Sequence, residues 1–208
     1  MKLQIALDTL SLDECIALLE ETKGYVDIAE VGTPFIIEEG LRPVRVLKER
    51  FPEIDVLADV KIMDAGHLEA SSCFKAGADI VTVLGLTHDE TVLGALEAAK
   101  EYGGKIMIDM IGVQNIEERT QQLEAMGVDI ICVHTAFDIQ STGHNPLEEL
   151  KRVNTVIKTA QRAIAGGVKL STVDEIVQEG IDIVVVGGAI SNANNRALAA
   201  KQLKERLL

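Results

Sequence analysis

Short apolar runs alternate with longer amphipathic stretches along the whole chain, a pattern typical of parallel α/β proteins. One signature recurs four times: a glycine, an aspartate two or three residues later, and then an apolar run. The glycine suits the left-handed backbone that follows a helix, and the aspartate opens a strand. Successive copies lie 53, 50 and 53 residues apart, about two strand–helix units of a small barrel, and they begin at Gly24, Gly77, Gly127 and Gly180.

A second set of apolar runs lies between these copies, and a polar residue or a glycine ends each run. The runs span residues 3–7, 56–58, 106–108 and 163–165. The two sets together predict eight strands. Helical patterns separate these strands, at residues 12–21, 34–50, 65–76, 90–102, 116–126, 146–158, 173–179 and 194–207.

Capping residues support several of the predicted helix starts. Ser11 is predicted as an N-cap, and Thr33 with Pro34 as an N-cap followed by the first helical residue. Further along, Ser171 with Asp174 resembles a capping box.

Eight strands alternating with eight helices predict a single-domain (β/α)8 TIM barrel over residues 1–208. The alternative is a doubly wound open sheet. That fold usually carries a G-x-G-x-x-G turn after its first strand, whereas Asp8-Thr9-Leu10 follows here. The regular repeat also favours closure, and the sequence contains no linker or low-complexity run.

Composition limits the partners of this chain. Hydrophobic residues make up 47% and aromatic residues 3%, with no Trp, so the core is expected to be aliphatic. The net charge is -13, from 20 Lys and Arg against 33 Asp and Glu, which argues against nucleic acid or an anionic membrane as a partner. A phosphorylated metabolite stays compatible, because backbone amides can bind phosphate locally.

The cysteines point to a reducing compartment. Cys15, Cys73 and Cys132 are far apart and form no CxxC motif, and Cys73 and Cys132 are expected to fill the core. The sequence also shows no signal peptide and no long apolar span. We therefore expect a cytoplasmic protein.

Polar residues gather where the predicted strands end, which is where barrel enzymes place their catalytic groups. The central segment is Asp59 to Asp64, in which Asp59 and Lys61 share one strand face and Asp64 follows three residues later. These residues alone could equally form a salt bridge that plugs the barrel. The full ring comprises Asp8, Glu30, Asp59, Lys61, Asp64, Asp109 and His134.

The carboxylates of this ring would repel one another unless a cation joined them. Glu30 and Asp59, on adjacent strands, offer the hard oxygen ligands that Mg²⁺ prefers. A pair between Glu30 and Lys61 is the competing interpretation. His134 is the candidate general acid or base, although a histidine in this position could also be a satisfied core residue. The other histidines, His67, His88 and His144, are expected to be structural, capping or solvated.

The last two predicted strands end in paired glycines, at Gly166-Gly167 and Gly187-Gly188. Glycine lets the backbone approach a ligand closely. Loops after the seventh and eighth strands form the usual phosphate site of a barrel. These turns therefore predict a phosphate-binding site, although tight turns alone would also need glycine.

Asp-x-Lys-x-x-Asp after the third strand is the signature of the orotidine 5′-monophosphate decarboxylase suprafamily, which this chain resembles over its whole length. Residues 30–34, 59–64 and 133–140 look most like its hexulose-phosphate synthase branch. The near relative is the keto-gulonate-phosphate decarboxylase branch. Both branches are described as Mg²⁺-dependent barrels that act through a 1,2-enediolate at a dimer interface.

The resemblance implies roles for individual residues. Glu30 and Asp59 would bind Mg²⁺, and Asp64 would reach into the site of the partner subunit. Lys61 would stabilise the enediolate, and Asp8 and Asp64 would position hydroxyls or hold Lys61. Asp138 and Gln140 would orient His134 or line the mouth of the site.

Departures from the family pattern separate the branches. The orotidylate enzymes carry Lys at the end of the second strand, where this chain has Glu30. The keto-gulonate decarboxylases carry Arg three residues after the histidine of strand six, where this chain has Phe137. The synthase reaction, which joins formaldehyde to D-ribulose 5-phosphate, is therefore favoured over decarboxylation. An isomerising or non-catalytic sugar-phosphate binder is a further alternative.

Overall fold

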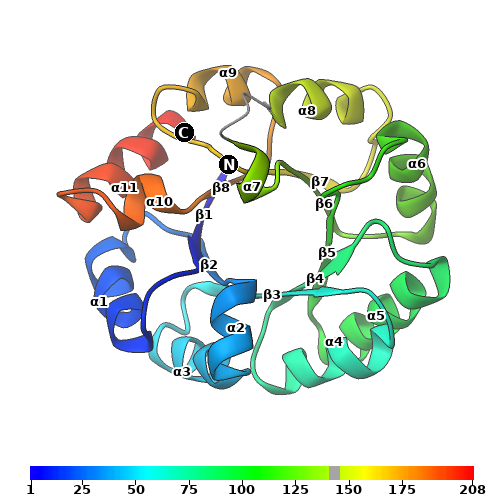
Figure 1. Ribbon diagram of the computed structural model, residues 1–208, viewed down its shortest axis with the longest axis horizontal. Coiled ribbons are helices and arrows are strands. Elements are labelled where there is room, and N and C mark those ends of the chain that lie inside the picture. Colours follow the sequence, from blue (N-terminus) through cyan, green and yellow to red (C-terminus); the bar gives the residue numbers. More distant parts are fainter. Residues whose placement is uncertain (141–145) are drawn as a thin grey trace.

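The computed structural model describes residues 1–140 and 146–208. Eight parallel strands form a closed barrel in sequence order, and β1 pairs with both β2 and β8. Figure 1 shows the strands as a ring with helices around the outside. The predicted TIM barrel is confirmed, and the open doubly wound sheet is excluded. The strands are β1 (Lys2–Leu7), β2 (Ile28–Val31), β3 (Asp55–Ile62), β4 (Ile80–Leu84), β5 (Lys105–Asp109), β6 (Ile130–His134), β7 (Gln161–Ala165) and β8 (Ile183–Val186).

Most helices lie at the predicted positions, whereas the short helices at residues 137–140 and 188–191 were not predicted. The predicted helix over residues 34–50 is two helices, because Gly40 has a positive φ of 60° and ends the first one. The helix that begins at Pro146 ends at Asn154, four residues earlier than predicted. The helices are α1 (Leu12–Thr22), α2 (Thr33–Glu39), α3 (Arg42–Arg50), α4 (Gly66–Lys75), α5 (Asp89–Tyr102), α6 (Ile116–Met126), α7 (Phe137–Gln140), α8 (Pro146–Asn154), α9 (Val173–Gln178), α10 (Gly188–Ser191) and α11 (Arg196–Arg206).

One of the three predicted helix caps is confirmed. Ser11 and Glu14 form a reciprocal capping box at the start of α1. Thr33 is not an N-cap, because α2 already begins at this residue and the preceding Gly32 occupies the cap position. The box at Ser171 is also wrong, since Thr172 is the N-cap of α9 and its side chain makes no capping bond.

The four repeated aspartates tie neighbouring strands together at the amino end of the barrel. Each carboxylate accepts a hydrogen bond from the first residues of the strand before it, at 2.7–2.9 Å. Each backbone carbonyl accepts one from the strand after it, at 2.7–3.1 Å. The repeat in the sequence is therefore a repeated clasp between strands, made by Asp27, Asp79, Asp129 and Asp182.

The core is mainly aliphatic, as predicted, although Phe35, Phe51 and Phe74 are also buried in it, and it has two parts. The larger part lies between the sheet and the helices, and the smaller part fills the barrel interior with residues such as Ile28, Leu57 and Ile130. The three cysteines are free and buried, and Cys132 belongs to the interior cluster. Among the described residues, no helix is both long and apolar enough to span a bilayer.

Candidate active site at the carboxyl end of the barrel

Strand β3 does not end at Asp59 as predicted but continues to Ile62 through a bulge. Ala58 pairs with Val81 and Ile62 with Val83, so the pairing between the two strands shifts within this stretch. Within it, Lys61 adopts a left-handed backbone with φ of 50°. A residue with a side chain adopts this conformation at a cost of about 1–2 kcal/mol. Such local strain is typical of functional sites.

Lys61 lies between two buried carboxylates. Its Nζ forms a short ion pair with Asp59 Oδ2 and lies 3.5 Å from Asp109 Oδ2. Burial alone would lower the pKa of Lys61, but the charges of Asp59 and Asp109 outweigh burial and raise it to about 12. Lys61 is therefore a fixed positive charge at neutral pH. The predicted competing pair of Lys61 with Glu30 is wrong, since the ion pairs of Lys61 within the described chain are with Asp59 and Asp109.

Two threonine hydroxyls hold Asp59 in addition to Lys61. Thr33 Oγ1 lies 2.9 Å from Asp59 Oδ2 and accepts a bond from Lys61 Nζ at 3.1 Å. Thr82 Oγ1 donates to Asp59 Oδ1 at 2.8 Å. The sequence analysis missed both residues, because Thr33 resembled a helix cap and a threonine in a strand is ordinary.

His134 is bonded to Asp109 rather than to Asp138 or Gln140. His134 Nδ1 lies 2.9 Å from Asp109 Oδ2, across the pair β5–β6. Burial would raise the pKa of Asp109, but the bond and charge of His134, together with Lys61, hold it below its ordinary value. An ionised carboxylate only accepts hydrogen bonds, so Nδ1 carries the proton. In the neutral imidazole, Nε2 then has the lone pair that a general base requires.

Glu30 lies deeper in the barrel, where Gln4 holds it. Gln4 Nε2 donates to Glu30 Oε2 at 2.6 Å, and the two residues are 1% and 9% exposed. Burial and the charge of Asp59 raise the pKa of Glu30 well above its ordinary value. Gln4 was also missed, although a glutamine inside the apolar run 3–7 was a usable signal. Its Oε1 is buried without a partner among the described residues.

Glu30 and Asp59 together supply two carboxylates, which is fewer than a metal site built from protein side chains alone would need. Within residues 1–140 and 146–208, no group of three or more His, Cys, Asp or Glu side chains is placed to hold a metal. Mg²⁺ usually takes one or two carboxylates and completes its shell with water and substrate oxygens. Burial and, after it, the charge of Asp59 raise the pKa of Glu30, and a cation beside the two carboxylates would oppose both effects.

Asp8 and Asp64 are both exposed at the rim of the site. Although Asp8 is exposed as a residue, partial desolvation of its carboxyl by the surrounding protein and the charge of Asp59 raise its pKa. Asp8 packs against Gly32, where an added Cβ would lie 2.0 Å from its Oδ1. Asp64 accepts a bond from the backbone N–H of Ala65 at 2.7 Å, whereas the carboxylates that hold Lys61 are Asp59 and Asp109.

The paired glycines follow β7 and β8, as predicted. Gly166 and Gly167 have φ of 98° and 72°, and a Cβ on Gly166 would lie 2.4 Å from the carbonyl oxygen of Thr135. The fold alone therefore requires glycine at 166. At Gly187 a Cβ would meet only ordinary contacts, including Asp8 Oδ2 at 3.9 Å, and Gly188 opens α10.

The segment after β6 contributes side chains to the rim. Gln140 donates to the carbonyl of Thr135 at 3.3 Å and lies near Gly167, so it joins the loops after β6 and β7. Asp138 is exposed, and Phe137 is 86% exposed. Phe137 therefore neither packs under the loop nor closes the site within one chain.

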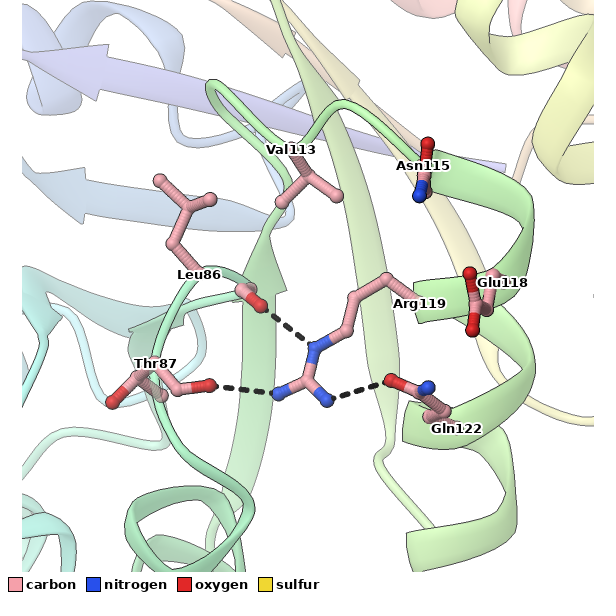
Figure 2. A pocket seen from close by; sticks show the side chains of 8 residues that line it. Leu86, Thr87, Val113, Asn115, Glu118, Arg119 and Gln122 are labelled. Carbon is pink, nitrogen blue, oxygen red and sulfur yellow. Dashed lines mark hydrogen bonds between the residues drawn. The ribbon is translucent and has the colours of Figure 1, made fainter.

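His67, His88 and one surface cavity lie apart from this ring. His67 pairs with Glu101, His88 is an exposed N-cap without a side-chain capping bond, and His144 lies outside the described residues. A cavity of about 320 Å³ lies between the loop after β4 and α6. Figure 2 shows Arg119 beside this cavity, where it donates to the carbonyls of Gly85 and Thr87 and thereby ties the loop to α6.

Comparison with known proteins identifies the family to which this chain belongs. The model described as "Orotidine 5'-phosphate decarboxylase / HUMPS family" matches residues 1–203. The chain belongs to this family. This assignment agrees with the signature Asp59-x-Lys61-x-x-Asp64. Asp59 and Lys61 of this signature form an ion pair in the site.

Similar members of the family carry synthase and decarboxylase names. The chain is 49% identical to the 3-hexulose-6-phosphate synthase of Bacillus subtilis (strain 168), over 100% of this chain and 99% of that protein. The crystal structure of 3-hexulose-6-phosphate synthase from Salmonella typhimurium is 43% identical, with a TM-score of 0.97 over 100% of this chain and 98% of that chain. A ligand-bound crystal structure named KGPDC, from Streptococcus mutans, is 25% identical, with a TM-score of 0.91 over 99% and 96% of the two chains.

Proposed function

We propose that this protein is a carbon–carbon lyase that condenses formaldehyde with D-ribulose 5-phosphate, the reaction of a 3-hexulose-6-phosphate synthase. Relatives that are 44–49% identical over nearly the full chain carry this name. The observation that carries the proposal is the position of Lys61, held between Asp59 and Asp109 beside His134. A fixed cation next to an oriented base suits the formation of an enediolate.

His134 is the proposed base. Its Nε2 would remove the proton from C1 of ribulose 5-phosphate, next to the C2 carbonyl. General base catalysis of this kind contributes roughly 10²–10⁴-fold. Asp109 would keep the imidazole in the required tautomer and stabilise the positive charge that the ring gains. In this role Asp109 must stay ionised, and its lowered pKa is consistent with that requirement.

Lys61 is the proposed partner of the negative charge that develops on O1 and O2 of the enediolate. A cation that is already oriented stabilises such a charge without reorganising during the reaction. Glu30 and Asp59 would hold Mg²⁺, which supplies Lewis-acid stabilisation of the same oxygens when bound. C1 then attacks the formaldehyde carbon, and the new alkoxide takes back the proton that His134 removed.

The sugar phosphate would be held away from the reacting carbon. The backbone amides near Gly166, Gly167, Gly187 and Gly188 would bind the phosphate, and this binding energy would orient the sugar. Asp8 would position a sugar hydroxyl at the rim. Gln140 would keep the loops after β6 and β7 together, and Asp138 would line the mouth.

We infer further that two chains share their sites in a cytoplasmic homodimer. Asp64 is exposed on its own subunit, and a role in a neighbouring site would explain a carboxylate in this place. The family resemblance supports the same arrangement. Met63 beside it is 50% exposed, which suits burial against a partner.

Decarboxylation of 3-keto-L-gulonate 6-phosphate is the second candidate function. Its support is the structural similarity to a protein named 3-keto-L-gulonate-6-phosphate decarboxylase from Vibrio cholerae, at a TM-score of 0.86 and 26% identity. Both reactions pass through the same enediolate, so Lys61 and His134 serve either. Phe137 favours the synthase, because it offers no proton to C1 after CO₂ leaves.

An assay of both substrates, with Mg²⁺ and with a chelator, tests the proposal. We expect condensation of ribulose 5-phosphate with formaldehyde to exceed decarboxylation and to need Mg²⁺. Glu30→Gln should weaken Mg²⁺ binding, measured by calorimetry, together with activity. Glu38→Gln, at an exposed position on α2, is the matched control. Faster decarboxylation than condensation would overturn the proposal, and unchanged Mg²⁺ dependence in Glu30→Gln would remove Glu30 from the metal site.

A further inference from the structure

Thr82 lies opposite the bulge of β3, where the ladder between β3 and β4 is interrupted. Ala58 pairs with Val81 and Ile62 with Val83, so the three residues 59–61 face Thr82 alone. The side chain of Thr82 is 3% exposed and faces the interior of the barrel. A hydroxyl at this position can replace the backbone bonds that the bulge leaves unmade.

The hydroxyl of Thr82 makes two hydrogen bonds of opposite sense. It donates to Asp59 Oδ1 at 2.8 Å and accepts from the backbone N–H of Lys61 at 2.9 Å. A hydroxyl has one donor and two acceptor positions, so both bonds form together. One side chain of β4 thus contacts both residues of the central ion pair.

The two oxygens of Asp59 have different partners. Lys61 Nζ and Thr33 Oγ1 contact Oδ2, and Thr82 Oγ1 contacts Oδ1. Each carboxylate oxygen can accept about two bonds. Because Thr82 holds the oxygen that Lys61 does not, it fixes the rotation of the carboxylate about its bond to Cβ.

The bond to Lys61 acts on the backbone rather than on the amine. Lys61 has a left-handed conformation that a residue with a side chain adopts only when its surroundings hold it. The hydrogen bond from the backbone N–H of Lys61 to the Thr82 hydroxyl stabilises this conformation. If this hydrogen bond is lost, the backbone of Lys61 can relax toward an ordinary extended conformation. The amine of Lys61 then moves relative to Asp59 and Asp109.

We propose that Thr82 is a positioning residue, which sets the geometry of the Asp59–Lys61 pair through its two hydrogen bonds. It touches no reacting atom in this arrangement. The inference rests on the proposed function for its kinetic effect, but its structural effect on Lys61 is independent of any activity.

Three variants separate the hydroxyl from the rest of the side chain. Thr82→Val keeps the shape and removes both bonds, whereas Thr82→Ser keeps the hydroxyl and removes a methyl group. Thr120→Val is the matched control, because the Thr120 hydroxyl in α6 is also buried and has no partner among the described residues. Chemical unfolding of each variant shows whether it is folded before its kinetics are compared.

We expect Thr82→Val to lower kcat for the condensation by about 10- to 100-fold, the range for loss of a bond to a charged group. The KM for ribulose 5-phosphate should change less than about threefold. Thr82→Ser should recover most of the lost activity, and Thr120→Val should behave as the parent. Hydrogen exchange of the Lys61 amide, followed by NMR, should become at least about tenfold faster in Thr82→Val only.

Parent-like kcat and Lys61 protection in Thr82→Val would overturn the proposal. An equal loss of activity in Thr82→Ser and Thr82→Val would also overturn it, because the packing of the methyl group rather than the hydroxyl would then matter. If the parent does not condense formaldehyde, yet Thr82→Val alone still accelerates exchange at Lys61, the proposed function fails and the positioning role of Thr82 stands.

Discussion

His134 Nδ1 and Asp109 Oδ2 lie 2.9 Å apart, so a side-chain bond joins the ends of β5 and β6 in addition to their backbone ladder. Asp109 Oδ2 is also 3.5 Å from Lys61 Nζ. One carboxylate therefore connects the proposed base with the proposed cation. Any change at Asp109 alters the surroundings of both groups.

Replacement of Asp109 by Asn should lower kcat by about 10²-fold or more, because an amide no longer fixes the tautomer or balances the imidazolium. NMR of ¹⁵N-labelled imidazole reports the tautomer directly. We expect the parent to carry its proton on Nδ1 of His134 and the variant to lose this preference. Asp13→Asn, at an exposed position on α1, is the control. A variant with parent activity would exclude the assigned role of Asp109.

Glu124 should stabilise the fold in a pH-dependent way. Its carboxylate accepts bonds from the backbone N–H groups of Lys158, Thr159 and Ala160 at 2.7–2.8 Å. Partial burial would raise the pKa of Glu124, but these bonds outweigh burial and lower it. A lowered pKa means that the folded state binds fewer protons, so the stabilisation is complete above the unfolded value of about 4.3 and is lost as pH falls through the folded value.

Glu124→Gln should therefore lower Tm by about 2–4 °C at pH 7, the shift that about 1 kcal/mol gives in a chain of this size. The difference from the parent should shrink as pH falls below about 4. Thermal unfolding between pH 3 and pH 8 measures both. Glu97→Gln, on the exposed face of α5, should show no such trend. A difference that is independent of pH would contradict the assigned charge effect.

Gly187→Ala tests the proposed phosphate site. An added Cβ meets only ordinary contacts, at 3.7–3.9 Å, so the variant should fold. The methyl group would occupy space near the amides that the phosphate needs, and KM for ribulose 5-phosphate should rise about tenfold or more. Gly24→Ala, where an added Cβ meets nothing within 4 Å, is the control. An unchanged KM would place the phosphate elsewhere.

Mixing two inactive chains tests the shared sites. Lys61→Ala removes the cation of its own site, and Asp64→Asn removes a carboxylate that we assign to the partner's site. In a mixed dimer one site would then carry both defects and the other neither. We expect a substantial fraction of parent activity in purified mixed dimers. An inactive mixed dimer would show that Asp64 acts within its own subunit.

Phe137→Arg should raise the share of decarboxylation. Phe137 is 86% exposed, so the substitution should leave stability almost unchanged. The guanidinium would place a hydrogen-bond donor, and with it an ordered water, beside the site. The ratio of kcat/KM for the two substrates measures the effect, with Leu198→Arg on α11 as the control. The same ratio in parent and variant would show that position 137 does not discriminate.

The positions of the acidic residues could be predicted from the sequence because each one ends an apolar run. Asp8 and Asp109 mark the carboxyl ends of β1 and β5, Asp59 ends the apolar part of β3, and only a closed parallel barrel brings all of these positions together. The eight-strand count followed from the repeat in the same way. The strand ends and the repeat are local signals that a single chain displays directly.

The partners of those residues could not be predicted, because they depend on register. The bulge of β3 is visible only when β4 is placed beside it, and the contact of Thr82 with Lys61 follows from that bulge. Thr33 was misassigned because a threonine before a proline is also a common helix start. Gln4 was overlooked because one polar residue in a strand does not reveal which face it occupies.

The clasps of the four repeated aspartates continue across the junction between the chain ends. Lys2 N donates to the carbonyl of Asp182 at 2.7 Å, just as Lys105 N donates to that of Asp79 at 2.9 Å. The barrel is therefore a ring of four equivalent modules, and the ends of the polypeptide interrupt one junction that resembles the other three. Circular permutants opened in an exposed loop between modules would keep every clasp, so the order of the modules along the gene is separable from their order around the ring.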